Sequence, residues 1–569
     1  MKSKQLKLSA LAAAVGIAAA TAFGQSEAPV GMDTVTDFRS AVTQGVMTNP
    51  RVVAEWYNFE ATREAERGAR GGYLPSVDLY SEWGREDRET PLIDLGDYSR
   101  DATRFSITQM LFDGFATRDE VARLGYAKLS RYYDFKRASE EIALEAAAAY
   151  LDTVKYQKLV QFAEDNYIVH KNVYEKIEER TGGGVSQGVD LEQAAARVAL
   201  AESNLVTEIT NLHDVMTRFH RVVGSMPGEG LALPTVPAGQ IPELRESALR
   251  MAYQRSPVIN AAIENLRSSQ EALNATNAPM MPRLDLRYRN EVEHDTDGLD
   301  GRFDEEAIEV VVSYNLFRGG SDSARKREFY NLYNAAIEER KQACLNVRQE
   351  VTIAFNDVEA LERQVEVLQR NLMAQDKTRR AYRDQFDIGQ RTLLDLLDSQ
   401  NEYFDTQRAH TSAMTDLAAA QARTLANMGL LLASMDMDGL KADKIAELDL
   451  DFSRDSDDEN AQALCPQATP LPAAVDRDAL FARLNASADP LTPEAAAASA
   501  AALAGLAAGS DRYRVVDGEL VYLEVDVQFD FNSSIISSAY DDQVALAAEL
   551  LRENAGVRAT VEGHTDSSG

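Results

Sequence analysis

Four charged residues in two related segments have the spacing needed to act together. Asp395 and Asp398 are three residues apart, so on a helix their carboxylates share one face. Arg391 precedes Asp395 by one helical turn, and Asp190 lies in a related segment earlier in the chain. Stacked carboxylates repel anions and concentrate cations, and a guanidinium can hold a carboxylate through a charge-assisted bond. The alternative is that all four are solvated helix charges that contribute little in pairs.

The chain contains no arrangement of residues that would support enzyme chemistry. Its six His residues are scattered and lack the His-Glu-x-x-His spacing of a zinc protease. The glycine-rich segment from Gly182 to Gly188 lacks the Lys-Ser/Thr ending of a phosphate-binding loop and is better interpreted as a hairpin turn. There is no sign of a serine nucleophile elbow with its partners. We therefore expect no catalytic residue, no metal and no cofactor, and any coupled ATP hydrolysis would come from a partner.

Composition and the N-terminus indicate an exported, acidic protein. The 569 residues carry a formal net charge of −32, which argues against nucleic-acid binding because phosphates need basic patches. Residues 1–24 combine three lysines, an Ala-rich apolar run and small residues at Ala22 and Gly24, and we interpret them as a cleaved signal peptide. Cys344 and Cys465 lie far apart without ligand spacing, so we expect two free thiols.

An internal repeat organises most of the chain. The Leu-Phe-x-Gly motif that begins at Leu111 recurs at Leu316, an offset of 205 residues (316 − 111 = 205). The same offset relates two further pairs, Asp190 with Asp395 and the predicted hairpin-turn glycines Gly184 with Gly389. We therefore predict two copies of one unit followed by an acidic, Ala/Pro-rich linker and a separate domain, at residues 25–240, 241–450, 451–510 and 511–569.

Each copy has the order helix, strand, loop, strand, very long helix, tight turn and helix. Period-two alternation of apolar residues predicts the strands, and polar stretches between them predict the loops. The strands are residues 77–84, 104–111, 284–292 and 307–316, and the loops are 85–101 and 294–305. Long polar loops at one end of the strands and short connections at the other are typical of an outer-membrane β-barrel.

The long helices carry a heptad seam. In the second copy, apolar residues from Val347 to Leu372 step alternately by four and three residues. Subtracting 205 places the first copy, from Ile142 to Tyr167, in the same register. A helix from Thr117 to Arg180 would be roughly 95 Å long at about 1.5 Å per residue. An ordinary coiled-coil rod is the alternative for these helices alone.

Four strands cannot close a barrel. An open sheet edge in lipid leaves backbone hydrogen-bonding groups unpaired at a high cost in free energy, and even eight strands enclose only side chains. We therefore expect the chain to oligomerise, with the long helices continuing the barrel as a helical tube. Closure of the barrel requires more than one chain but does not fix their number.

Together these motifs resemble the TolC family over residues 30–433. The most specific match is the segment from Ile388 to Asp398 (IGQRTLLDLLD), which is similar to the family's periplasmic-tip segment. The resemblance implies an α+β membrane protein: a trimeric twelve-stranded β-barrel, with four strands per chain, continued by a long coiled-coil α-helical periplasmic tunnel. It also implies a location in the outer membrane of a Gram-negative bacterium, and partners that comprise outer-membrane lipid, a periplasmic adaptor (membrane fusion) protein and an inner-membrane ABC or proton-driven pump.

The same resemblance assigns roles at the tip. It implies that Arg391 reaches across to Asp190 and helps to hold the tip closed. In a trimer, Asp395 and Asp398 would form two rings of three carboxylates each. Phe386 stands where family members place a Tyr that also bonds in this gate, so we expect one hydrogen bond of the closed tip to be missing.

The last residues resemble the first half of an OmpA-like peptidoglycan-binding domain. A strand, a helix and a second strand are predicted between residues 525 and 561, and they lead into a His-Thr-Asp turn. The resemblance implies that Asp566 of this turn binds the diamino acid of the cell-wall peptide, together with an Arg on a following helix. The sequence stops at Gly569, before that helix, so we expect a partial α/β OmpA-like domain. An incomplete domain that does not bind is the alternative.

Two functions are compatible with these features. The first is a passive duct from the periplasm to the exterior, for proteins or for small toxic compounds. The second is a structural tether that links the outer membrane to the cell wall. Within the first class, type I secretion and multidrug efflux are not separated by the sequence, and the resemblance of the C-terminus to OmpA-like extensions favours secretion of large adhesins.

Overall fold

The structure, a computed structural model, describes residues 34–89, 94–184, 187–296, 301–437, 465, 479–482, 513–516 and 519–523. They belong to two compact units, Met1–Gln467 and Ala468–Gly569. The predicted signal peptide, most of the predicted linker and Asp566 lie outside the described residues. No helix among the described residues is long and apolar enough to cross a bilayer.

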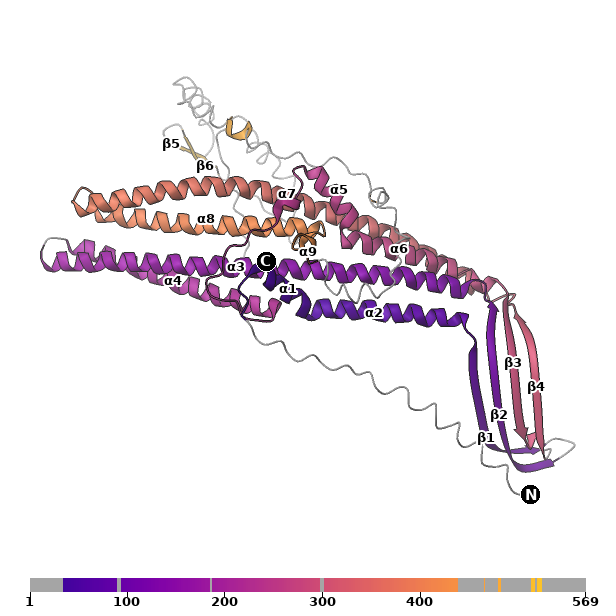
Figure 1. Cartoon of the computed structure of the whole chain (residues 1–569). Coiled ribbons are helices and arrows are strands. Elements are labelled where there is room, and N and C mark those ends of the chain that lie inside the picture. The colour runs from indigo at the N-terminus through magenta and orange to yellow at the C-terminus, as the bar shows by residue number, and fades with distance from the viewer. Residues whose placement is uncertain are drawn as a thin grey trace. The chain divides into compact units, whose positions relative to one another are not determined.

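The two halves of the first unit have the same order of elements (Figure 1). The first half comprises α1 (Phe38–Thr48), α2 (Pro50–Arg70), η1 (Gly71–Tyr73), β1 (Ser76–Glu89), β2 (Asp94–Phe112), α3 (Ala116–Gly182) and α4 (Gly188–Val223). The second comprises η2 (Ala238–Gln240), α5 (Arg245–Arg255), α6 (Pro257–Ala275), η3 (Ala278–Met280), β3 (Arg283–His294), β4 (Arg302–Ser313), α7 (Ser321–Asp387), α8 (Leu393–Asn427) and α9 (Leu431–Ser434). The helices α3 and α7 both have 67 residues and start 205 residues apart (321 − 116 = 205).

The heptad seam predicted for the long helices is their packing face. In α7 the seam residues from Val347 to Val358 are buried, and in α3 those from Ile142 to Thr153 are buried. The helices α3 and α4 form one antiparallel hairpin, α7 and α8 form the other, and the two hairpins run alongside each other (Figure 1). Apolar side chains at heptad spacing therefore hold long helices together without a globular core.

The Leu-Phe-x-Gly motifs mark the corners where strands give way to long helices. Gly114 has a φ of +70° and Gly319 a φ of +64°, in the left-handed region that glycine adopts without steric cost. A Cβ atom on Gly114 would lie 2.7 Å from the carbonyl oxygen of Ala278 and 2.9 Å from the Cβ atom of Met281. The first corner therefore requires glycine both for its backbone conformation and for its close packing.

The four strands form one antiparallel sheet in the order β1-β2-β3-β4, so β1 and β4 are its edges. The strands are longer than the sequence predicts. Most of the expected loop 85–101 pairs as strand, from Arg85 opposite Ser99 to Asp87 opposite Asp97, and β4 starts at Arg302 and ends at Ser313 rather than at Leu316. The loop prediction was wrong because the outer parts of the strands carry charged residues, which do not produce an apolar alternation. The end of β4 was wrong because Tyr314 and Leu316 continue the alternation although they lie in the corner before α7.

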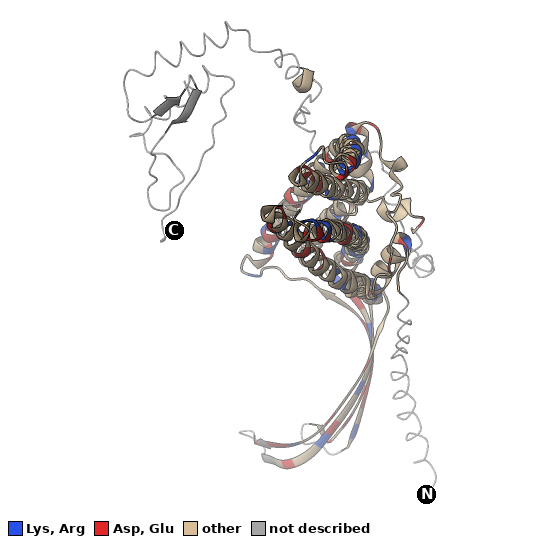
Figure 2. Ribbon diagram, turned by 90° about the vertical axis from the view of Figure 1, so that its left-hand side faces the viewer, with Lys and Arg blue, Asp and Glu red and all other residues tan. Residues whose placement is uncertain are grey.

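The register gives the sheet one apolar and one charged face. Residues that are paired across neighbouring strands point to the same face of the sheet. The pairs Leu79–Phe105 and Tyr288–Ile308 lie on the apolar face. On the other face, arginines and glutamates of neighbouring strands form ion pairs: Arg100 with Glu82, Arg104 with Glu291 and Arg289 with Glu305. Figure 2 shows the sheet as a curved ribbon that extends from the helices, with charged residues along its strands. A sheet with one apolar and one charged face fits a boundary between lipid and water.

The two cysteines are joined, which corrects the expectation of free thiols. Cys344, in the buried face of α7, forms a disulfide with Cys465, with 5.6 Å between the two Cα atoms. Their sequence separation of 121 gave no local spacing to recognise, because the fold alone brings them together. An exported protein is the kind in which such a bond persists.

The second unit is described at few residues. A short helical turn occupies residues 479–482, and β5 (Tyr513–Val516) pairs antiparallel with β6 (Glu519–Leu523). The strands and the helix expected between residues 525 and 561 lie outside the described residues.

Candidate functional site at the hairpin tips

Each hairpin of long helices ends in a turn that contains a predicted glycine. Gly184 has a φ of +73° and its amide donates to the carbonyl of Thr181 over 3.0 Å. Gly389 has a φ of +76° and its amide donates to the carbonyl of Phe386 over 3.0 Å. A side chain would meet nothing within 4 Å at either position, so the backbone conformation alone favours glycine here.

Asp395 closes a capping box at the start of α8. The Thr392 hydroxyl accepts from the amide of Asp395 at 3.2 Å, and the Asp395 carboxylate accepts from the Thr392 hydroxyl at 2.9 Å and from the Thr392 amide at 3.3 Å. These bonds, with a smaller contribution from Arg391, lower the pKa of Asp395 below its ordinary value. The sequence signal for this role, which was not recognised, is a Thr three residues before an Asp at the start of a helix.

Arg391 does not pair with Asp190 within the chain. Its Nε donates to Oε1 of Gln385 over 2.9 Å, its guanidinium carbon lies 4.3 Å from the centre of the Tyr382 ring, and Asp395 is 3.9 Å away. No ion pair joins Arg391 to Asp190 in the part of the chain that the structure describes. Within one chain the turn directs Arg391 back onto its own hairpin, and its contact with Asp190 in the closed tip stays a prediction.

Other charged residues bridge the two hairpins. Arg197 of α4 and Asp398 of α8 form an ion pair at 2.5 Å, and Lys176 of α3 lies 3.7 Å from Asp387 at the end of α7. Arg197 follows Asp190 by seven residues, two helical turns, and so lies on the same side of α4. That spacing was the available signal for Arg197, which sequence analysis missed.

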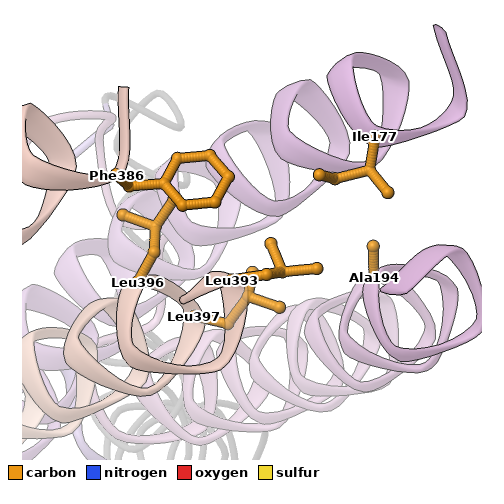
Figure 3. Close-up of a cluster of buried hydrophobic side chains, with 6 residues drawn as sticks. All are labelled: Ile177, Ala194, Phe386, Leu393, Leu396 and Leu397. Carbon is orange, nitrogen blue, oxygen red and sulfur yellow. The ribbon is translucent and has the colours of Figure 1, made fainter. Parts of the chain in front are cut away.

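Apolar side chains from both hairpins form one cluster beside these charges (Figure 3). Ile177 and Ala194 come from the first hairpin, and Phe386, Leu393, Leu396 and Leu397 come from the second. Phe386 is 8% exposed, and the guanidinium carbon of Arg180 lies 5.5 Å from its ring centre. Phe386 therefore connects the hairpins by packing and by a cation–π contact.

A buried polar layer follows this cluster along the interface between α3 and α8. Nε2 of His170 lies 3.0 Å from Oδ1 of Asn401. Asn166, which precedes His170 by four residues, and Gln400, which precedes Asn401, are also buried. Each of these four side chains has a buried polar atom without a partner among the described residues. Burial lowers the pKa of His170, and the charge of Arg197 acts in the same direction. This layer makes the interface easier to open than an apolar one.

The tips therefore combine a small apolar cluster, half-exposed ion pairs and a polar layer. Such contacts can hold two hairpins together and can also release them at modest cost in free energy. Within the described ranges, no group of three His, Cys, Asp or Glu residues could hold a metal ion. The site has the properties of a movable contact between helices.

Comparison with known proteins gives a family for the chain. The profile described as "Outer membrane efflux protein" matches residues 46–224 and 248–429. The chain is 24% identical to the outer membrane efflux protein BepC of Brucella suis over 328 residues, which are 58% of this chain and 72% of BepC. It is 21% identical to the outer membrane protein TolC of Vibrio cholerae over 424 residues, 70% of this chain and 93% of TolC. It is also 21% identical to the proteases secretion protein PrtF of Dickeya chrysanthemi over 380 residues, 63% of this chain and 80% of PrtF.

Solved structures of outer-membrane channels have the same fold. The Campylobacter jejuni CmeC channel superposes with a TM-score of 0.62 at 15% identity, covering 76% of this chain and 99% of CmeC. The Neisseria gonorrhoeae MtrE channel superposes with a TM-score of 0.60 at 16% identity, covering 72% of this chain and 95% of MtrE.

These findings confirm the resemblance to the TolC family and a location in the outer membrane with extension into the periplasm. TolC-family channels are homotrimers that work with adaptor proteins and inner-membrane pumps in tripartite systems, and they are not enzymes. The matched residues end at position 429, before the predicted OmpA-like domain. Since the profile covers more than half of the chain and both repeats, the chain belongs to the outer membrane efflux protein family.

Proposed function

We propose that three copies of this chain close one twelve-stranded barrel that carries molecules from the periplasm to the exterior. The observation that supports this proposal is the sheet with β1 and β4 at its edges and an exposed apolar face. On that face Leu79 is 72% exposed, Trp83 78% and Ile308 76%. Pairing β4 of one copy with β1 of the next would satisfy both edges, and lipid would cover the apolar face.

Light scattering of the detergent-solubilised protein tests the assembly, with the mass of three chains expected. Two variants on neighbouring residues of β4 test the faces. Ile308→Arg places a charge on the proposed lipid face, where it costs about 2–4 kcal/mol at mid-bilayer, whereas Glu309→Arg places the same charge on the opposite face. Only Ile308→Arg should reduce assembly in the outer membrane. A folded, membrane-inserted monomer would contradict the proposal.

The hairpin tips form the periplasmic gate in this proposal. The Arg197–Asp398 pair, the Lys176–Asp387 pair and the apolar cluster would hold it closed, and separation of the hairpins would open it. Asp395 and Asp398 of three copies would form acidic rings. Replacing both by Asn should reduce the cation preference of the channel and its block by trivalent cations from the periplasmic side. Contact between Arg391 of one copy and Asp190 of another stays a prediction.

The cargo proposed is protein, exported by type I secretion together with an adaptor and an inner-membrane ABC pump. Support comes from the relative PrtF, which is described as a proteases secretion protein. Efflux of small toxic compounds with a proton-driven pump is the second candidate, supported by the likeness to BepC. In the native bacterium, deletion of the gene should abolish the release of a secreted protein and leave drug tolerance unchanged. The opposite pattern would favour efflux.

Anchoring to peptidoglycan through Asp566 is the last part of the proposal, and the sequence resemblance alone supports it. The protein should sediment with purified peptidoglycan, and Asp566→Ala should abolish this. Asp541→Ala, a carboxylate of the same predicted domain outside the His-Thr-Asp turn, is the matched control. Equal sedimentation of all three proteins would exclude a role for Asp566. Export that persists without residues 451–569 would show that the duct does not depend on the anchor.

A further inference from the structure

A cavity of about 920 Å³ lies where the sheet gives way to the long helices. Its lining comes from the start of α3, the end of α6, the first residue of β3, the last residue of β4 and the start of α7. Four arginines line it against two carboxylates: Arg123, Arg283, Arg318 and Arg325 against Asp113 and Glu120. The lining itself therefore carries more guanidinium groups than carboxylates, although Asp285 and Asp322 lie close behind Arg283 and Arg318.

The strand register decides which side of the sheet the cavity faces. Arg283 and Ser313, which both line the cavity, are partners at the end of the β3–β4 ladder. The ladder has no bulge, so this pair shares a face with Arg287 and Glu309, on the charged side. The adjacent pair, Leu284 and Val312, lies on the apolar side. The cavity is therefore on the face that would line the inside of the proposed barrel.

Both acidic residues of the lining are already engaged. The Asp113 carboxylate accepts from the amide and the hydroxyl of Thr117, at 2.8 and 2.6 Å, and so caps α3. Glu120 forms an ion pair with Arg123 at 2.6 Å. The charge of Asp113 still acts on Arg283, but neither carboxylate forms an ion pair with Arg318 or Arg325 among the described residues.

The remaining arginines are incompletely paired. Arg283 holds Asp285 through its Nε at 2.8 Å, and Arg318 lies 3.4 Å from Asp322. The Arg325 guanidinium carbon lies 5.6 Å from the centre of the Phe329 ring, and no carboxylate pairs with it among the described residues. All three residues are exposed, so their guanidinium groups have donors available to a ligand.

We propose that Arg283, Arg318 and Arg325 form an anion-binding site inside the conduit, which takes the carboxylate or phosphate groups of a molecule in transit. A guanidinium matches the geometry of both groups and can donate two parallel hydrogen bonds to either. Apolar lining at Ala272, Ala275 and Met281 lowers the local dielectric and strengthens such bonds. The inference rests on the proposed conduit, in which the site would stand between the barrel and the helical tunnel.

Single-channel recording in a planar bilayer tests the site, with pyrophosphate added on the extracellular side as the probe. Pyrophosphate should block the wild-type current, and Arg318→Gln with Arg325→Gln should weaken the block by at least about tenfold. Lys326→Gln with Arg327→Gln is the matched control, because it removes the same amount of charge from the start of α7, beside Arg325 in sequence but outside the cavity lining. The single variant Arg325→Gln should give a smaller effect in the same direction.

Titration calorimetry of the detergent-solubilised protein with pyrophosphate gives the same comparison without requiring a current. A wild-type protein that neither binds nor is blocked by pyrophosphate would overturn the inference, and so would equal binding by the two double variants. A wild-type protein that carries no current but binds pyrophosphate through these arginines would contradict the conduit and leave the anion site standing.

Discussion

Replacing Arg197 by Gln should favour separation of the two hairpins, because its guanidinium holds Asp398 across their interface at 2.5 Å. The two side chains are 30% and 47% exposed, so water screens the pair in part. Exposed ion pairs contribute about 0.2–1 kcal/mol to stability, and charge-assisted bonds protected from water about 1.5–3 kcal/mol. Because this pair is only partly exposed, we take a value between the two ranges, about 1 kcal/mol. Loss of the pair in all copies of a trimer would total about 3 kcal/mol, a shift of roughly 150-fold toward the open state.

The open fraction of single channels in a planar bilayer measures this shift, and leakage of a large antibiotic into cells gives a second measure. Arg197→Lys keeps the charge and should stay close to wild type. Arg380→Gln is a matched control, since the ion pair of Arg380 with Asp376 lies within α7 and its removal should open the channel less.

A double-mutant cycle with Asp398→Asn shows whether the two residues act as a pair. Once Arg197 has been replaced, Asp398→Asn should add little, because the interaction is already lost. A wild-type open fraction for Arg197→Gln, or effects of the two substitutions that simply add, would refute the assignment of this pair to the closed state.

Three further predictions follow from the packing. Cys465→Ser opens the covalent loop closed by a disulfide with a sequence separation of 121, and the chain-entropy model gives such a loop about 5 kcal/mol of stabilisation. The urea midpoint of unfolding should therefore fall in the variant, and a reductant should lower the midpoint of the wild type by the same amount. Two reactive thiols in the oxidised wild-type protein would contradict the disulfide. Gly114→Ala should destabilise the protein by more than about 1 kcal/mol in thermal unfolding, because Gly114 has a positive φ and lies against Ala278. Gly71→Ala is the control and should not destabilise the protein, because the space around Gly71 is open. Equal thermal stability of the two variants would contradict the requirement for glycine at the first corner. Burial lowers the pKa of His170, so this side chain binds a proton less readily in the closed packing than when it is exposed, and the closed packing should lose stability as the pH falls below about 6.5. The open fraction of the channel should therefore rise between pH 7.5 and 5.5 in the wild type but not in His170→Gln. Identical pH profiles of the two proteins would contradict a role for His170.

Periodic features of the fold could be predicted from the sequence. The heptad seam around Val351 and the glycine of each Leu-Phe-x-Gly corner depend on local spacing and local backbone conformation, and both recur after 205 residues. The long helices and the existence of four strands follow from these signals. The ends of the strands do not follow from these signals, because cross-strand ion pairs such as Arg85 with Asp97 depend on a partner strand, which the local sequence pattern does not contain.

The contacts of the candidate site were harder to predict than its location. The turn glycines and the segment from Ile388 to Asp398 identified the tips, but the partner of Asp398 proved to be Arg197, more than two hundred residues away in sequence. The geometry of a side chain in a turn decided the contacts of Arg391. The seven-residue spacing of Arg197 from Asp190 indicated a shared side of α4 but not the partner of Arg197, because long-range pairing, of charges as of cysteines, is set by the packing of the hairpins.

The disulfide makes the two hairpins inequivalent in covalent topology, although their backbones repeat. Cys344 and Cys465 close a ring that contains the rest of α7, the second tip, and all of α8 and α9. A protease that cuts once near Gly389 therefore leaves a single covalently joined molecule, and a fragment separates only after reduction. A cut near Gly184 divides the chain into two unconnected pieces at once. Electrophoresis with and without reductant can thus report which of the two tips a protease has reached.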